Sequence, residues 1–348
     1  MTRIAVFVVD DTSTEQMLQA STWLLGRATE VRWSSPGWRG SLSLPSNGRT
    51  PRINTFKIML PLLSGCRDLT SLVLTGIAVS GEHQHAIYCL PHLRKISLRS
   101  ACFQDTAIKM PKHNVTQLRF FNAPGEVALS HILRQTSSTL TTLRVSEGPT
   151  KAFSLDTPRC PRLTTFTHYS TWRVNRGVIV FLERHPNIRV LRLSGGVQDL
   201  GPSLLPELTK LTANWKLSCF FLARSVLTEF YQHPNDLSMS VSELWSSLTQ
   251  ARRSQRHPPR LNQLRVAILY NSLSLGALPV ISHFFGSSLC KLHIWIEGGS
   301  MRCFDRDYSY LLGGWSRLEG PATMRFARLR SIRVSFGLRY GAEFPEAI

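Results

Sequence analysis

Arginine returns at one position of a recurring sequence pattern, and its side chain is the strongest candidate for chemistry in this chain. Arg119, Arg144, Arg192, Arg265 and Arg333 each stand directly between two apolar positions of the pattern. A guanidinium group presents a rigid fork of donors that matches carboxylate and phosphate oxygens, and it also stacks on aromatic rings. A surface that gathers these arginines would bind an anion.

Other residues that could support catalysis or bind a metal lack the spacing that such chemistry requires. The sequence has no phosphate-binding glycine loop, no Gly-x-Ser-x-Gly elbow and no His-Glu-x-x-His motif. His83 and His85 have no third ligand in local spacing, so we expect them to be solvated loop histidines. Cys102 and Cys160 stand at turns, where we expect small packing residues and not nucleophiles. We therefore predict no enzymatic activity, no metal and no cofactor.

The composition is that of a basic, folded protein without a disulfide framework. Of its 348 residues, 43% are hydrophobic and 18% are charged, so the chain can bury a large core. The seven cysteines are scattered and form no Cys-x-x-Cys pair, which favours an intracellular compartment, cytoplasmic or nuclear. The net charge of +19 favours an acidic partner. Residues 266–290 carry no charge, but Asn271 and Pro279 argue against a membrane span.

A pattern Leu-x-x-Leu-x-Leu, with other apolar residues allowed at the leucine positions, recurs along the chain. Between residues 69 and 213 its copies start 20–25 residues apart, which is the period of leucine-rich repeats. No single repeat can bury its apolar side alone, so neighbours must stack to close a core. The copies begin at Leu69, Leu93, Val115, Leu140, Leu163, Ile188, Leu208, Leu261, Leu289 and Leu329.

We predict an α/β fold, a single leucine-rich-repeat solenoid (horseshoe) over residues 1–348, with parallel strands on its concave face and helices or irregular arms on its convex face. The position that many such repeats fill with asparagine holds other residues here, such as Ile77 and Ala101, so we expect no asparagine ladder. The clearest repeats cover residues 54–213 and further repeats cover 261–340, with irregular insertions near 34–52 and 214–260. Weaker strands are expected at 4–8 and 31–33, and helices at 12–25 and 177–184.

Alternation along each strand predicts which side chains face a partner. The residue between the second and third leucines must point away from the core, onto the concave face. The predicted partner-binding residues are Arg99, Arg119, Phe121, Arg144, Tyr169, Arg192, Arg265, His293, Trp295 and Arg333. The preferred ligand is an acidic or phosphorylated protein segment. Two alternatives stay open: solvated arginines that cover their neighbours with aliphatic stems, and salt-sensitive, non-specific binding of nucleic acid.

Several phrases join a helix, a turn and the next strand in the same way: LPLLSGCRDLTSLVL (60–74), ILRQTSSTLTTLRV (132–145), CPRLTTFTHY (160–169) and FLERHPNIRVLRL (181–193). Residues 54–212 thereby resemble the F-box/leucine-rich-repeat proteins, especially a divergent set in mushroom-forming fungi. The resemblance implies a substrate receptor of a cullin ubiquitin ligase, in which an N-terminal F-box docks on the adaptor and the repeats capture the target. Residues 1–50 show no Leu-Pro-led F-box pattern. We therefore expect the adaptor as a partner only if an F-box lies outside this sequence or hidden in it, and a ligase-independent scaffold is the alternative.

Overall fold

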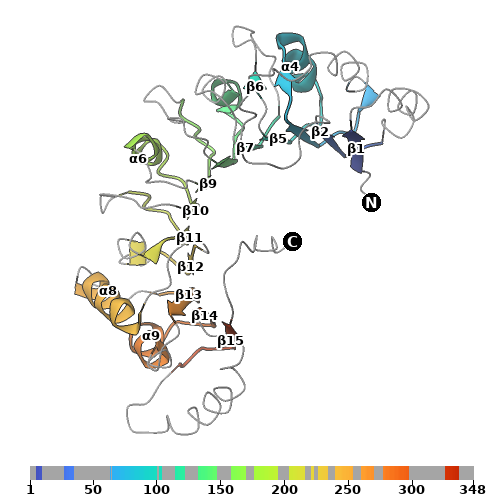
Figure 1. The fold of residues 1–348 in the computed structure, drawn as a ribbon. Coiled ribbons are helices and arrows are strands. Elements are labelled where there is room, and N and C mark those ends of the chain that lie inside the picture. Colours follow the sequence, from blue (N-terminus) through green and yellow to red (C-terminus); the bar gives the residue numbers. More distant parts are fainter. Residues whose placement is uncertain are drawn as a thin grey trace, which may run out of the picture. The chain divides into compact units, whose positions relative to one another are not determined.

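A computed structural model shows the chain as two compact units, each built on parallel strands (Figure 1). Unit 1 comprises residues 1–169 and 175–188, and unit 2 comprises residues 170–174 and 189–348. The residues that the structure describes are 5–9, 27–34, 63, 65–99, 102–103, 114–121, 132–146, 158–169, 176–194, 204–215, 221–222, 226–233, 240–253, 260–269, 277–297 and 326–336. The predicted helix at 12–25 and the predicted insertion near 34–52 lie outside them, apart from Ser34 at the end of a strand.

Unit 1 carries one parallel sheet in which each strand pairs with the strand of the next repeat. In sheet order its described strands are β1 (Ala5–Val9), β2 (Glu30–Ser34), β3 (Ser71–Thr75), β5 (Lys95–Arg99), β7 (Gln117–Phe121), β8 (Thr142–Ser146) and β9 (Thr165–Tyr169). The two weak strands expected at the start of the chain are confirmed as β1 and β2. Two short strands, β4 (Ala78–Val79) and β6 (Cys102–Phe103), pair separately.

Two helices of unit 1 return the chain between strands. Helix α4 (Gly81–Tyr88) and helix α6 (Arg176–Glu183) both lie on the same side of the sheet (Figure 1). Phe181 of α6 packs on Phe166 of β9, with ring centroids 4.9 Å apart. The helix predicted at 177–184 is therefore confirmed as α6, and its apolar side faces the core.

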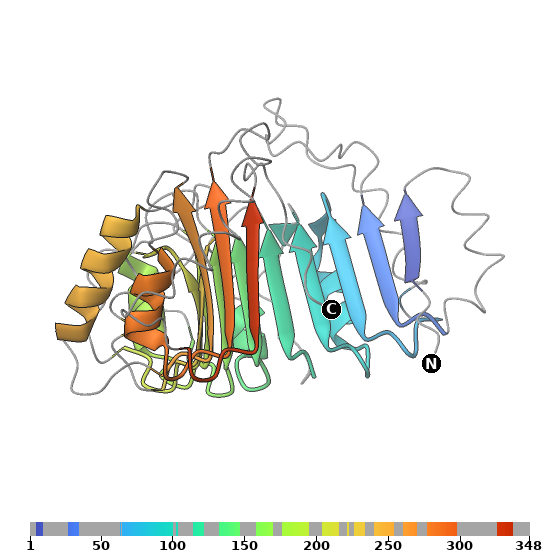
Figure 2. The same cartoon turned by 90° about the horizontal axis from the view of Figure 1, so that it is seen from below.

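Unit 2 repeats the same arrangement, and its strands point in one direction (Figure 2). In sheet order they are β10 (Val190–Leu193), β11 (Lys210–Ala213), β12 (Glu229–Gln232), β13 (Gln263–Leu269), β14 (Lys291–Glu297) and β15 (Ser331–Phe336), with helices α8 (Val241–Arg253) and α9 (Ala277–Phe285). The segment 214–260 was predicted to be an irregular insertion, and this is wrong for its described part. Strand β12 and helix α8 lie there, so the segment supplies a repeat of its own.

Continuous columns of leucine form the core, as the repeat pattern predicts. Alternate residues of a strand face opposite sides, so the leucines of successive repeats meet on one side of the sheet. Each predicted column residue is at most 1% exposed: Leu72, Leu74, Leu93, Leu118, Leu143, Leu191, Leu193 and Leu211. Together with the parallel register, these columns confirm the α/β leucine-rich-repeat solenoid.

The uncharged stretch at 266–290 forms repeat structure. It contains the end of β13 and all of α9. Among the described residues, no helix has both the length and the apolarity that a bilayer crossing needs.

A ladder of threonines joins the repeats at the start of their strands. The carbonyl of Thr116 accepts hydrogen bonds from the N–H groups of Thr141 (2.9 Å) and Thr142 (3.0 Å), and also from the Thr141 hydroxyl (3.1 Å). The same hydroxyl-to-carbonyl contact recurs from Thr70 to Thr29, Thr116 to Arg94, Thr164 to Thr141, Thr209 to Arg189 and Thr228 to Thr209. This ladder occupies the leucine-threonine junctions of the repeat pattern, and it supplies contacts between repeats where no asparagine ladder is expected.

Replacing Thr141 with valine should weaken unit 1 by about 1 kcal/mol of unfolding free energy. Valine keeps the shape of the side chain and the two backbone hydrogen bonds, so the loss reports the ladder hydroxyl alone. Equilibrium unfolding in urea would measure the difference. Thr142→Val is the matched control, because Thr142 is the next residue along the chain and the ladder hydroxyl at this junction belongs to Thr141. If both variants lose the same stability, the ladder contributes nothing specific.

A buried histidine joins helix α6 to the repeat before it. His185 is 3% exposed, its Nδ1 lies 2.6 Å from the carbonyl oxygen of Phe181, and its Nε2 accepts a hydrogen bond from the Cys160 N–H at 2.9 Å. With Nε2 as acceptor, Nδ1 must carry the proton, so the ring is neutral. Burial lowers the pKa of His185, and the positive charges of Arg184 and Arg159 lower it further.

Candidate partner-binding face

The side of each sheet opposite to the leucine columns carries the predicted partner-binding residues, and we call it the arginine face. In β7 and β8 the exposure alternates: Leu118 and Leu143 are buried, while Arg119, Phe121 and Arg144 are half-buried. The predicted orientation is therefore confirmed for these strands. Alternation also places Arg192, Arg265 and His293 on the arginine face of unit 2.

Strand register gathers the predicted residues of unit 1 over four neighbouring strands. Arg119 is the register partner of Arg144, and Arg99 is the register partner of Phe121. The Arg99 guanidinium carbon lies 5.2 Å from the centroid of the Phe121 ring, which is a cation–π contact. Phe121 pairs with Ser146 of β8, and Ser146 pairs in turn with Tyr169 of β9. Sequence distances of 20 or more residues thus become contacts between adjacent strands.

The row of residues between the second and third leucines is not exposed throughout. Ser97 and Thr167, which flank the Arg119 and Arg144 pair in register, are 2% and 0% exposed. Both were expected to project from the concave face into solvent, and this is wrong because both are buried. The accessible part of the row in β5 to β9 is the pair of arginines.

Positive charge is concentrated on the arginine face of β3 to β9. Its described positions hold four cations, Lys95, Arg99, Arg119 and Arg144, and no carboxylate. A cation in a partly buried position interacts more strongly with an anion than one in open water, because the local dielectric constant is lower. This part of the face is suited to a negatively charged group from outside the chain.

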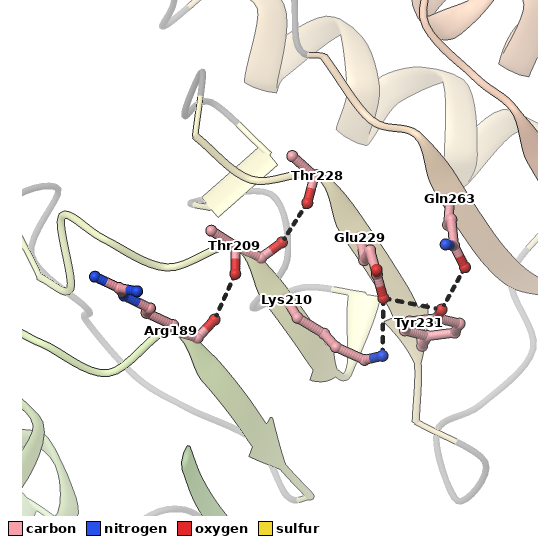
Figure 3. Close-up of polar contacts among 7 residues, drawn as sticks. All are labelled: Arg189, Thr209, Lys210, Thr228, Glu229, Tyr231 and Gln263. Atoms are coloured by element: carbon pink, nitrogen blue, oxygen red, sulfur yellow. Dashed lines mark hydrogen bonds and ion pairs between the residues drawn. The ribbon is translucent and has the colours of Figure 1, made fainter. Parts of the chain in front are cut away.

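In unit 2 the arginine face includes the carboxylate of Glu229, which is already engaged. Glu229 Oε2 lies 2.8 Å from Lys210 Nζ and 3.1 Å from the Tyr231 hydroxyl (Figure 3). The same hydroxyl lies 2.8 Å from Gln263 Oε1, and Lys210 Nζ lies 5.0 Å from the Tyr231 ring centroid. Burial, with the negative charge of Glu229, raises the pKa of Tyr231 to about 12, so the phenol stays protonated. Within this cluster the charges of Lys210 and Glu229 neutralise each other.

Sequence analysis missed Tyr231, the central residue of that cluster. Register places it between Thr212 of β11 and Arg265 of β13, in the row that continues through His293 to Arg333. The signal was present as Leu227-Thr228-Glu229-Phe230-Tyr231-Gln232, where glutamine replaces the third apolar residue of the pattern. Arg192 lies at the other end of the row, next to Thr212.

His293 is the titratable residue at the centre of the last three described strands. It pairs with Arg265 on one side and with Arg333 on the other. Its Nε2 lies 2.9 Å from Ser335 Oγ on the neighbouring strand. Burial lowers the pKa of His293 to about 4, and the charges of Arg265 and Arg333 contribute, so the ring is neutral near pH 7. Trp295, the next outward residue of β14, pairs with Ala267 and Ser335.

The remaining candidates for chemistry lie apart from this face. His83 and His85 belong to helix α4, so the expected loop is wrong. His83 is buried with its Nδ1 hydrogen-bonded to Ser80 Oγ, whereas His85 is exposed, as expected. The part of the chain that the structure describes holds no group of three potential metal ligands. Cys160 is buried, and burial raises its pKa to about 12, as suits a packing residue. The side chain of Cys102 lies outside the described residues.

Comparison with known proteins finds likeness in structure and none in sequence. No protein-family model matches this chain, and no curated protein matches its sequence. Among solved structures, an internalin from Listeria monocytogenes aligns over 96% of this chain and 81% of its own, with 12% sequence identity and a TM-score of 0.35. The fold assignment rests on the strand register and on the leucine columns: the chain is a leucine-rich-repeat solenoid.

Proposed function

We propose that this chain is a protein-interaction module that captures an acidic or phosphorylated segment of a partner on its arginine face. The observation that carries the proposal is the set of four cations without a carboxylate on β3 to β9. Adjacent strands lie about 4.8 Å apart, so Arg119 and Arg144 can hold one carboxylate or phosphate between them. Phe121 and Tyr169 add aromatic surface of the kind that anchors partners.

The ordering of these side chains favours capture. Arg99 is already held against Phe121, so less conformational freedom remains to be lost when a partner binds. Arg119 and Arg144 are half-buried, which also restricts their side chains. Pre-ordered cations that are partly shielded from water bind an anion more tightly than mobile lysines on an open surface.

A role as substrate receptor of a cullin ubiquitin ligase is the finer proposal, and it rests on the resemblance of residues 54–212 to F-box/leucine-rich-repeat proteins. An intracellular location, cytoplasmic or nuclear, goes with it, and the free thiols of Cys66, Cys89, Cys160 and Cys290 support a reducing compartment. Affinity purification of the tagged chain with nuclease present, followed by mass spectrometry, separates the alternatives. Recovery of the ligase adaptor supports the receptor. Specific proteins without the adaptor support an independent scaffold, and loss of all binding at high salt supports nucleic-acid association.

Replacing Arg119 and Arg144 together with glutamate should reduce recovery of the partner at least about tenfold, equivalent to about 1.4 kcal/mol. The double variant reverses charge at the centre of the cation cluster and leaves the leucine core intact. Quantitative mass spectrometry of the purified complexes would measure the loss.

The matched control is Arg134→Glu with Arg162→Glu, which makes the same change of charge at two exposed positions away from the sheet. Equal loss in both variants would mean that net charge alone attracts the partner. Unchanged recovery with the first variant would place the binding site elsewhere.

A further inference from the structure

We propose that Arg265, His293 and Arg333 form one binding site for a phosphate monoester on the partner, with His293 as a third donor between two arginines. This rests on the proposed function, and it names the ligand chemistry of one part of the arginine face. The site lies wholly within unit 2 and uses residues from three consecutive strands, β13, β14 and β15.

Register gives the site its geometry. Arg265 pairs with His293 and His293 pairs with Arg333, so the three side chains occupy one row across adjacent strands. With strands about 4.8 Å apart, the two arginine Cα atoms are about 10 Å apart and the imidazole lies midway. Arg265 and His293 are half-buried and Arg333 is exposed, so the row is accessible and its first two side chains are partly shielded. Two guanidinium groups can close on a central anion from either side, with the imidazole below it.

The charges around His293 favour an external dianion over a resident acid. On its own strand, β14, Lys291 is exposed and Glu297 lies four residues further along. From β13 it faces Arg265, and from β15 it faces Arg333. Glu229, the carboxylate on β12, forms an ion pair with Lys210 and accepts a hydrogen bond from the Tyr231 hydroxyl. The row itself, from Arg192 through Thr212, Tyr231, Arg265 and His293 to Arg333, contains no Asp or Glu.

Three donors match a phosphate monoester better than a carboxylate. The monoester carries three terminal oxygens and a charge of about −1.5 to −2 near neutral pH, whereas a carboxylate carries two oxygens and a single charge. Burial and the two arginines keep the free imidazole neutral, with a pKa of about 4. A bound dianion offsets the arginine charges, so His293 can take up a proton and donate a charged hydrogen bond. Ligand binding and protonation of His293 are therefore coupled.

The test is a histidine NMR titration of the full chain with and without phenyl phosphate, in which His293→Gln identifies the His293 signal. We expect saturating phenyl phosphate to raise the His293 midpoint from about 4 into the range of about 5–7. Benzoate, with the same ring and a carboxylate, should raise it much less. A midpoint that phenyl phosphate leaves unchanged overturns the proposal, and equal shifts with both ligands overturn the preference for phosphate.

Two variants separate this site from the rest of the arginine face. In Arg265→Gln with Arg333→Gln, the midpoint of the free protein should rise because two positive neighbours are gone, and phenyl phosphate should shift it no further. A continued response would show that the two arginines do not hold the ligand. Arg119→Glu with Arg144→Glu should lose partner capture and keep the full His293 response. If Arg119→Glu with Arg144→Glu still captures the partner and His293 still responds to phenyl phosphate, then the arginines of unit 1 are not the capture site. The phosphate site on unit 2 is supported in that case.

Discussion

Replacing Leu191 with aspartate should destabilise unit 2 by about 4 kcal/mol or more and lower its thermal midpoint by about 10 °C or more. Leu191 is 0% exposed and lies in register with Leu211 in the leucine column. A carboxylate there must either lose its hydration without a partner or take up a proton, and both cost free energy. Because each repeat is closed by its neighbours, the damage should extend to the adjacent repeats. Thermal unfolding followed by circular dichroism would measure it.

The matched control is Arg192→Asp, one residue further along the same strand and on the opposite side of the sheet. Arg192 is half-buried on the arginine face, so the same new carboxylate stays in contact with water. We expect its unfolding midpoint to change by only a few degrees. Equal destabilisation by both substitutions would reject the assignment of strand faces.

Replacing His185 with leucine should cost about 2–5 kcal/mol of unfolding free energy in unit 1. The imidazole satisfies two buried backbone groups at once, the N–H of Cys160 and the carbonyl of Phe181. Leucine fills part of the space and leaves both groups without a hydrogen bond, at about 1–3 kcal/mol each. Urea unfolding would measure the loss, with the exposed turn residue His92→Leu as the control.

The same histidine should make unit 1 sensitive to acid. The pKa of His185 is lowered in the folded protein, whereas the unfolded chain titrates near 6.5. Below pH 6.5 the unfolded state therefore binds more protons, so stability is complete above that pH and falls as the pH drops toward the folded pKa. His293 titrates in the same direction in unit 2, with a folded pKa of about 4. Between pH 6.5 and the folded pKa, His185→Leu should lose less stability than the parent. If stability falls equally with pH in the parent and in His185→Leu, folding does not lower the pKa of His185.

The fold was predictable because the core imposes its period on the sequence. Columns such as Leu72, Leu118 and Leu143 admit only apolar side chains, and their spacing follows from the length of one repeat. Strand β12 escaped prediction because Gln232 stands where a third apolar residue was required. That glutamine is buried, and its Oε1 accepts a hydrogen bond from the Ala267 N–H at 2.7 Å. Because the hydrogen-bond partner of Gln232 lies 35 residues away along the chain, the sequence around Gln232 does not indicate that a polar residue fits there.

The sequence predicts which face of the sheet carries the candidate site residues, but not which of these residues lie next to one another. Alternation alone places Arg119 and Arg144 on the face opposite to the leucines, and the structure confirms it. Which residues then touch depends on register, and the segments between strands differ in length. The contact of Glu229 with Lys210 and the position of His293 between its two arginines follow from pairing across those segments. Neither the composition nor the spacing of the repeats shows which residues become register partners on adjacent strands.

The threonine ladder also bears on how such a chain can change over evolutionary time. Each ladder hydroxyl in the described residues reaches the carbonyl of the repeat directly before it. At Arg94 and Asn262 the hydroxyl is missing, and the paired backbone N–H groups make the junction unaided. A duplicated repeat would bring its own donors and offer its own carbonyl to its successor, so whole repeats can be gained or lost by duplication and deletion of gene segments without compensating substitutions elsewhere. An insertion of one residue inside a strand has no such freedom, because it would move the leucines beyond it in that strand to the wrong face.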